Sequence, residues 1–145
     1  MKNQFSIAIT GVIVVFALAA CATTNAPADP SVGTKITVAG GSYTNVTPSQ
    51  LKEMLANKTF PFINVHVPYE GEIAQTDANI PYDQIGQNPS QLPADINAMV
   101  FVYCRSGNMS ATAAETLVRL GYTNVWNLDG GFNAWVQQGF PLINK

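Results

Sequence analysis

The sequence is poor in the residue types that form disulfide bonds or bind metal ions. Its 145 residues include two cysteines, Cys21 and Cys104, and one histidine, His66. A structural zinc site needs four ligands, drawn mainly from cysteine and histidine. We therefore expect no metal site. The two cysteines allow one disulfide bond at most, and its formation depends on the fate of Cys21.

Charge is also scarce. Only 11% of the residues are charged, and Lys and Arg together number 7 against 9 Asp and Glu, for a formal net charge of −2 and a pI near 5.1. Nucleic-acid-binding proteins usually carry a strongly basic face. This composition argues against a nucleic-acid partner.

The chain has one long apolar run, at residues 5–20, preceded by Lys2. A helix of this length spans about 24 Å, which is shorter than a ~30 Å hydrocarbon core. The charged start, apolar middle and small residues at the end favour an export signal. An ordinary signal peptide or a short membrane anchor would share these features.

The run ends in Leu-Ala-Ala-Cys, residues 18–21, which resembles the lipobox of bacterial lipoproteins. The resemblance implies that residues 1–20 are a lipoprotein signal peptide and that Cys21 is lipidated. It also implies an extracytoplasmic protein, in the periplasm or cell envelope, whose lipid anchors it to a membrane. Cys104 is then the only thiol left, so no intramolecular disulfide is expected.

Two regions follow the predicted signal. Residues 21–41 are rich in Ala, Thr, Pro and Gly without sustained periodicity, and we predict the lipidated cysteine and a flexible tether there. Residues 42–145 are predicted to form one domain. Within it, we expect strands at 42–46, 61–67, 98–103 and 124–128, helices at 48–55, 110–120 and 130–139, and loops with short helical turns over 68–97.

This alternation of strands and helices predicts an α/β fold with a mostly parallel central sheet and helices on both faces. Ligands of such sheets bind beyond the carboxyl ends of the strands. Cys104 follows the apolar strand predicted at 98–103 and precedes a predicted helix. The helix N-terminus, the loop amides and Arg105 would form an anion cradle around a thiolate. Alternatively, Cys104 is a small buried residue and Arg105 points into solvent.

The segment Cys-Arg-Ser-Gly-Asn-Met-Ser, residues 104–110, resembles the active-site loop of rhodanese-like domains, the sulfurtransferase family. Residues 61–73, "PFINVHVPYEGEI", resemble the early strand and acidic loop of that family. Residues 128–142, "LDGGFNAWVQQGFPL", match its closing Gly-Gly, Trp and Gly-hydrophobic-Pro pattern. The resemblance covers about residues 42–143 and implies the three-layer rhodanese-like fold.

The resemblance also implies a mechanism without a cofactor. Cys104 would be the catalytic nucleophile, taking a sulfur atom from thiosulfate or a low-molecular-weight persulfide and passing it to a thiol or to cyanide. The substrate-binding and anion-binding loop would consist of Arg105, Ser106, Gly107, Asn108, Met109 and Ser110. Rhodanese-like domains also occur as non-catalytic binding or regulatory modules, which is the alternative function. The oligomeric state stays open.

Ser110 separates this loop from a phosphatase loop. Protein phosphatases on a related scaffold need an arginine after Cys and five further residues, because that arginine clamps the phosphate. Ser110 occupies this position, and Arg105 lies directly beside the cysteine. A phosphatase activity is therefore disfavoured.

Several positions differ from the usual family pattern. Asn64 stands where Asp is usual and His66 where Arg is usual, while Asn108 and Met109 replace a second basic residue. The cradle is less positive as a result, and Met109 would favour a bulkier donor than thiosulfate. His66 would either modulate the thiolate or order the following loop. Glu70 is a possible modulator together with His66, although for Glu70 and Glu72 we favour solvated side chains over the rim of the site. For Trp126 and Trp135 we favour the core over a ligand-binding role.

Overall fold

The computed structural model describes residues 32–144, and the predicted signal peptide and Cys21 lie outside this part of the chain. Its sheet has the strand order β1-β2-β6-β5-β3-β4, with every neighbouring pair parallel except β1 and β2. The strands are β1 (Thr34–Val38), β2 (Gly41–Val46), β3 (Phe62–Asn64), β4 (Ala78–Asn79), β5 (Val100–Tyr103) and β6 (Val125–Leu128). The predicted α/β fold with a mostly parallel sheet is confirmed.

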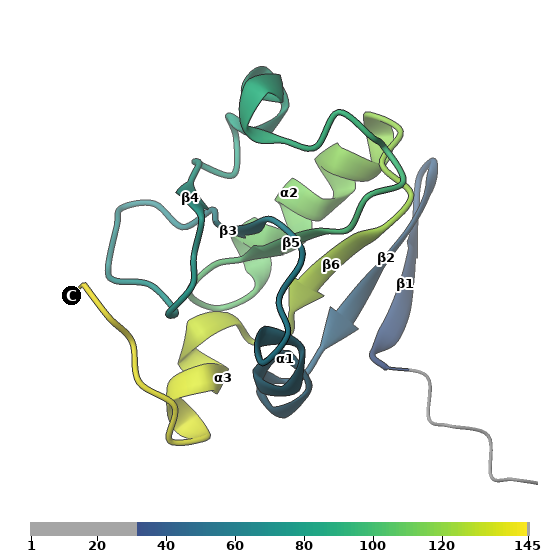
Figure 1. The fold of residues 1–145 in the computed structure, drawn as a ribbon. Coiled ribbons are helices and arrows are strands. Elements are labelled where there is room, and N and C mark those ends of the chain that lie inside the picture. The colour runs from purple at the N-terminus through teal and green to yellow at the C-terminus, as the bar shows by residue number, and fades with distance from the viewer. Residues whose placement is uncertain (1–31, 145) are drawn as a thin grey trace, which may run out of the picture.

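Helices cover both faces of the sheet (Figure 1). Helix α2 (Asn108–Arg119) lies on one face, and helices α1 (Pro48–Leu55) and α3 (Gly131–Gln137) lie on the other. The central strand β5 is buried along its whole length, and its side chains alternate between the two layers. Val100 and Val102 face the α2 layer, whereas Phe101 and Tyr103 face the α1 and α3 layer.

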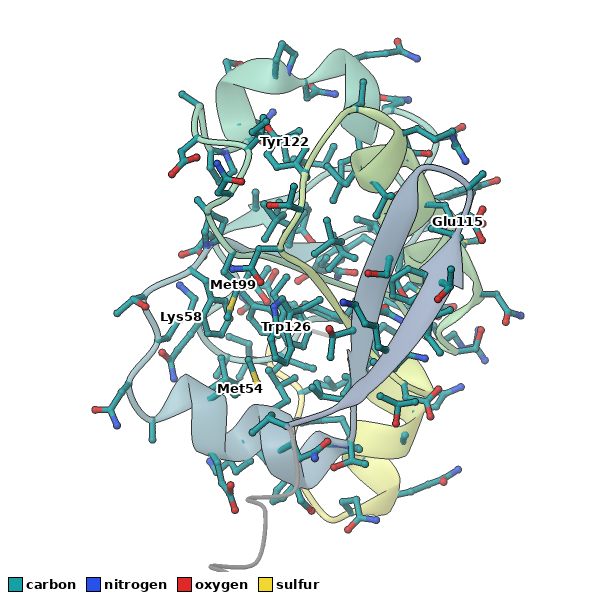
Figure 2. All side chains as sticks on the ribbon, turned by 90° about the vertical axis from the view of Figure 1, so that its right-hand side faces the viewer. Met54, Lys58, Met99, Glu115, Tyr122 and Trp126 are labelled. Atoms are coloured by element: carbon teal, nitrogen blue, oxygen red, sulfur yellow. The ribbon has the colours of Figure 1, made fainter. Side chains whose placement is uncertain are left out.

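The α1 and α3 layer is the aromatic half of the core. The ring of Phe62 packs against those of Phe101 and Tyr103, with ring centroids 5.4 Å apart for Phe62–Phe101 and 4.7 Å for Phe62–Tyr103. Trp135 is buried in this layer, and Trp126, Met54 and Met99 are partly buried against it (Figure 2). Both tryptophans are therefore packing residues, as the sequence suggested.

Helix α1 begins where its sequence predicts. Thr47 is the N-cap, Pro48 occupies the first turn, and Gln50 completes a capping box in which each residue bonds the other's backbone amide. Leu51 and Leu55 supply the buried face. The connection from β3 to β5 is irregular, as expected, and contains β4 and the short 3₁₀ helices η1 (Ile85–Gln87) and η2 (Pro89–Gln91).

The tether predicted over residues 21–41 is wrong for its C-terminal part. Residues 34–38 form strand β1, which pairs antiparallel with β2 through a turn at Gly40, where φ is +91°. Ile36 and Val38 pack against the α2 layer. The alternation of Lys35, Ile36, Thr37 and Val38 was the signal for this strand, and the polar composition around it hid the pattern. None of the helices in the described part of the chain combines the length and apolar character needed to span a bilayer.

Candidate functional site

The cysteine loop begins at the carboxyl end of β5. Cys104 directly follows Tyr103, and the chain turns at Gly107, which adopts a left-handed conformation with φ +93° and is the N-cap of α2. A residue with a Cβ atom is strained in this conformation, so glycine is favoured here. Helix α2 consequently begins at Asn108, two residues before the start predicted at residue 110. Asn108, Met109 and Ser110 thus belong to its first turn, whose amides lack intrahelical partners.

Cys104 is a free cysteine with 1% of its surface exposed. Its Sγ accepts a hydrogen bond from the backbone N–H of Gly107 at 3.1 Å, and the Ser110 hydroxyl lies 3.4 Å from Sγ. The same hydroxyl lies 3.1 Å from the carbonyl oxygen of Gly107, so its single hydrogen has two possible acceptors. Donors directed at sulfur stabilise a thiolate more than a thiol.

The Gly-Gly pair at residues 130–131 supports the cysteine loop from the side of α3. The N–H of Phe132 donates to the carbonyl oxygen of Cys104 at 2.8 Å, and the N–H of Asn133 donates to that of Arg105 at 2.9 Å. A Cβ atom on Gly131 would overlap the Cys104 carbonyl oxygen and lie 2.6 Å from the Arg105 carbonyl carbon. The sequence contained this motif, but the contact of Gly131 with residues 26 and 27 positions earlier could not be read from it.

Glu70 connects the two cationic or protonatable side chains near the loop. Its carboxylate accepts from Arg105 Nη1 at 3.1 and 3.2 Å, and Oε2 lies 3.0 Å from Nε2 of His66. The interpretation of Glu70 as a merely solvated side chain is therefore wrong. Glu72 instead contacts Asn79 and Asn144, so it is not part of this cluster.

His66 and Asn64 order the loop that carries Glu70. The buried side chain of Asn64 donates to the carbonyl of Gly71 at 3.2 Å and accepts from the His66 N–H at 3.0 Å. The His66 ring packs edge-on against Phe132, with centroids 5.6 Å apart. Its Nδ1 is buried and has no hydrogen-bond partner among the described residues. The Asn64 amide thus holds this loop without adding negative charge.

A pocket of about 400 Å³, the cysteine pocket, opens over the loop. It is lined by His66, Cys104, Arg105, Ser106, Asn108, Met109 and Asn133. The structure therefore brings most of the predicted site residues together, and it adds Asn133 of α3. Ser110 lies beneath the pocket, against the sulfur, and is fully buried.

The charge of this pocket is low. Arg105 is its only Lys or Arg, and Glu70 pairs with that guanidinium. Within residues 32–144, no group of three or more His, Cys, Asp or Glu side chains is placed to hold a metal ion. The arrangement can hold a nucleophilic sulfur, stabilise an added anionic sulfur atom with amides, and admit a small substrate beside Met109.

Comparisons with known proteins agree with this geometry. The model of one protein family, described as "Rhodanese-like domain", matches residues 47–138 of this chain. A sulfurtransferase of Allochromatium vinosum is 35% identical over 102 residues, which cover 68% of this chain and 92% of that protein. The uncharacterized protein slr1261 of Synechocystis sp. is 32% identical over 110 residues, which cover 73% of this chain but only 60% of that protein.

Solved structures give the same result. The crystal structure of a rhodanese-related protein from Thermoplasma volcanium superposes with a TM-score of 0.59 at 30% identity, covering 70% of this chain and 98% of that one. The sheet order, the cysteine loop and these relatives lead to one conclusion: the chain belongs to the family of rhodanese-like domains.

Proposed function

We propose that the chain is a sulfurtransferase or persulfide carrier with Cys104 as its nucleophile. The Cys104 thiolate attacks the outer sulfur of the donor, a new S–S bond forms, and the bond between that sulfur and the donor breaks. The electron pair leaves with the donor remnant, which is sulfite when the donor is thiosulfate. An acceptor thiolate or cyanide then attacks the outer sulfur of the persulfide and releases Cys104 as a thiolate.

The observation that carries this proposal is the surroundings of the Cys104 sulfur. Sγ receives the Gly107 N–H at 3.1 Å and has the Ser110 hydroxyl at 3.4 Å, at the start of a helix and at the base of a pocket. These donors support a thiolate and, one bond further out, a persulfide anion. The relative named a sulfurtransferase supports the same chemistry.

Turnover distinguishes the enzyme from the alternative, a non-catalytic binding module. The full-length chain, purified in detergent, is incubated with thiosulfate or glutathione persulfide as donor and cyanide or a thiol as acceptor. We expect transfer of sulfur that depends on protein concentration and is lost in Cys104→Ser. Ser90→Ala is the control, because Ser90 is exposed and lies outside the cysteine loop and its pocket. Absence of transfer with every donor would favour the binding module.

We also propose that the protein acts outside the cytoplasm, as a lipoprotein held to a membrane through Cys21. The Leu-Ala-Ala-Cys segment after an apolar run supports this location. Mass spectrometry of the membrane-bound protein is expected to find an acylated N-terminal peptide that begins at Cys21. If the Cys21→Ser protein stays attached to the membrane and its N-terminal peptide still carries a lipid, the anchor is elsewhere.

A further inference from the structure

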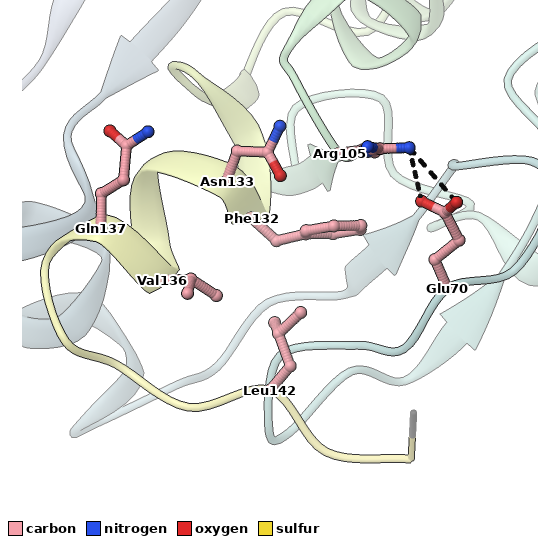
Figure 3. A pocket seen from close by; sticks show the side chains of 7 residues that line it. All are labelled: Glu70, Arg105, Phe132, Asn133, Val136, Gln137 and Leu142. Atoms are coloured by element: carbon pink, nitrogen blue, oxygen red, sulfur yellow. Dashed lines mark hydrogen bonds and ion pairs between the residues drawn. The ribbon is translucent and has the colours of Figure 1, made fainter.

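A second pocket adjoins the cysteine pocket, and the proposed reaction of Cys104 assigns it no role. It has a volume of about 460 Å³ and is lined by Glu70, Arg105, Phe132, Asn133, Val136, Gln137 and Leu142. The charged pair lies at one end of this pocket, Val136 and Gln137 lie toward the other, and Phe132 and Leu142 lie between them (Figure 3). The pocket thus changes from charged to apolar to amide along its length.

The two pockets share a wall. Arg105 and Asn133 line both of them, and Glu70 reaches the shared Arg105 with two contacts of 3.1 and 3.2 Å. A molecule that places a sulfur atom at Cys104 can therefore extend its remaining atoms past Arg105 into the second pocket. Thiosulfate is too short to occupy both pockets, whereas a thiol attached to a peptide-like chain has the required shape.

Resting on the proposed sulfur transfer, we propose that the second pocket binds the organic part of the donor, and that this donor is the persulfide of an amino-acid-derived or peptide thiol. The Glu70 carboxylate is the partner of the donor's ammonium group, and the Arg105 guanidinium is the partner of its carboxylate. Phe132, Val136 and Leu142 contact the carbon chain, and the Gln137 amide bonds a peptide group.

The charges of the site fit such a zwitterion better than a dianion. Glu70 neutralises Arg105, so a doubly negative donor meets a cation that is already paired. The pair is half exposed, with 53% of the Arg105 side chain and 38% of the Glu70 side chain accessible. Exposed ion pairs contribute little to stability, so a ligand carrying both charges can replace the Glu70–Arg105 contact at small cost.

The loading step is balanced with this donor. The Cys104 thiolate attacks the terminal sulfur of the persulfide, the Cys104–sulfur bond forms, and the bond between the donor's two sulfurs breaks. The donor leaves as its thiolate with that electron pair and takes a proton from solvent. No external oxidant or reductant is consumed.

Specificity constants test the proposal. We compare kcat/KM for sulfur loading from glutathione persulfide, from the persulfide of uncharged 2-mercaptoethanol and from thiosulfate, using the full-length chain in detergent. Glutathione persulfide is expected to exceed the mercaptoethanol persulfide by about tenfold or more, the equivalent of about 1.4 kcal/mol. Equal constants for the two persulfides would overturn the inference while leaving sulfur transfer intact. Loading from no donor would overturn the proposed function itself.

A pair of charge-matched variants locates the binding site. Val136→Glu places a carboxylate inside the second pocket, and Gln138→Glu places one on the exposed neighbouring position outside it. We expect Val136→Glu to lower the ratio of the glutathione persulfide constant to the thiosulfate constant about tenfold, and Gln138→Glu to leave that ratio unchanged. Because Val136 is 43% exposed, the substitution is compatible with folding, and circular dichroism checks this. An unchanged ratio in folded Val136→Glu would contradict the proposal.

Discussion

At the scale of single residues, the site is defined by how few charges it has. Arg105 is the cation of the cysteine pocket, and Glu70 holds it while also contacting His66. In place of a second basic residue in the loop, the chain presents Met109 to the pocket. The anion-binding capacity therefore comes mainly from backbone amides and the start of α2, which are fixed by the fold.

Glu70→Gln should increase the use of thiosulfate. Removing this carboxylate frees Arg105 for an anionic donor, so kcat/KM with thiosulfate is expected to rise several-fold at low ionic strength. The gain should shrink as salt screens the charges. Glu72→Gln is the matched control, since Glu72 contacts Asn79 and Asn144 instead of Arg105. A fall in the constant for Glu70→Gln would indicate that Glu70 is needed to position the loop.

At the scale of elements, the cysteine loop is held between two helices. Helix α2 begins at its end and supplies the Ser110 hydroxyl, while the first residues of α3 donate backbone N–H groups to the carbonyls of Cys104 and Arg105. Gly131 makes this close approach possible because it has no Cβ atom. The position of the nucleophile thus depends on α3, which is distant from it in sequence.

Gly131→Ala should therefore damage both stability and loading. Gly139→Ala is the control, because Gly139 also has a positive φ (+82°) but open space around it. The control is expected to lose about 1–2 kcal/mol of unfolding free energy from backbone strain alone. Gly131→Ala adds overlap with the loop, worth about 1–3 kcal/mol more, and should slow sulfur loading. Urea denaturation and loading rates measure both effects; equal losses in the two variants would refute the contact.

At the scale of the whole molecule, sequence patterns predicted the structural features that depend only on residues close to one another in the chain. The buried strand before Cys104, the capping box at Thr47 and the alternation of elements all follow local chemistry, and the structure has them. The Glu70–Arg105 pair and the support from Gly131 join residues that lie far apart in sequence, so no local pattern contains them. Strand β1 was missed because its alternation is short and three of its five residues are exposed.

A buried tyrosine of the aromatic layer makes the stability of the whole fold sensitive to alkaline pH. Burial raises the pKa of Tyr103 well above its ordinary value of 10.0, against hydrogen bonds that its hydroxyl makes with the Ile73 N–H and Thr76. Above pH 10, the unfolded chain loses this proton while the folded chain keeps it. The free energy of unfolding therefore falls as pH rises, by up to about 1.4 kcal/mol per pH unit for this group.

Tyr103→Phe should reduce that alkaline slope. The variant is expected to lose about 1–3 kcal/mol at neutral pH, because the buried Ile73 N–H keeps no partner, but to lose stability more slowly between pH 10 and 11. Urea denaturation at a series of pH values measures the slope. Identical slopes for the two proteins would show that Tyr103 does not cause the alkaline loss.

Intact mass spectrometry is the most direct test of the central claim that Cys104 carries a sulfur atom. The full-length chain is incubated with glutathione persulfide or thiosulfate, freed of donor, and weighed with and without a reducing agent. The account predicts a gain of one sulfur atom that maps to Cys104, disappears on reduction and is absent in Cys104→Ser. An unchanged mass with both donors, or a sulfur adduct that persists in Cys104→Ser, would contradict it.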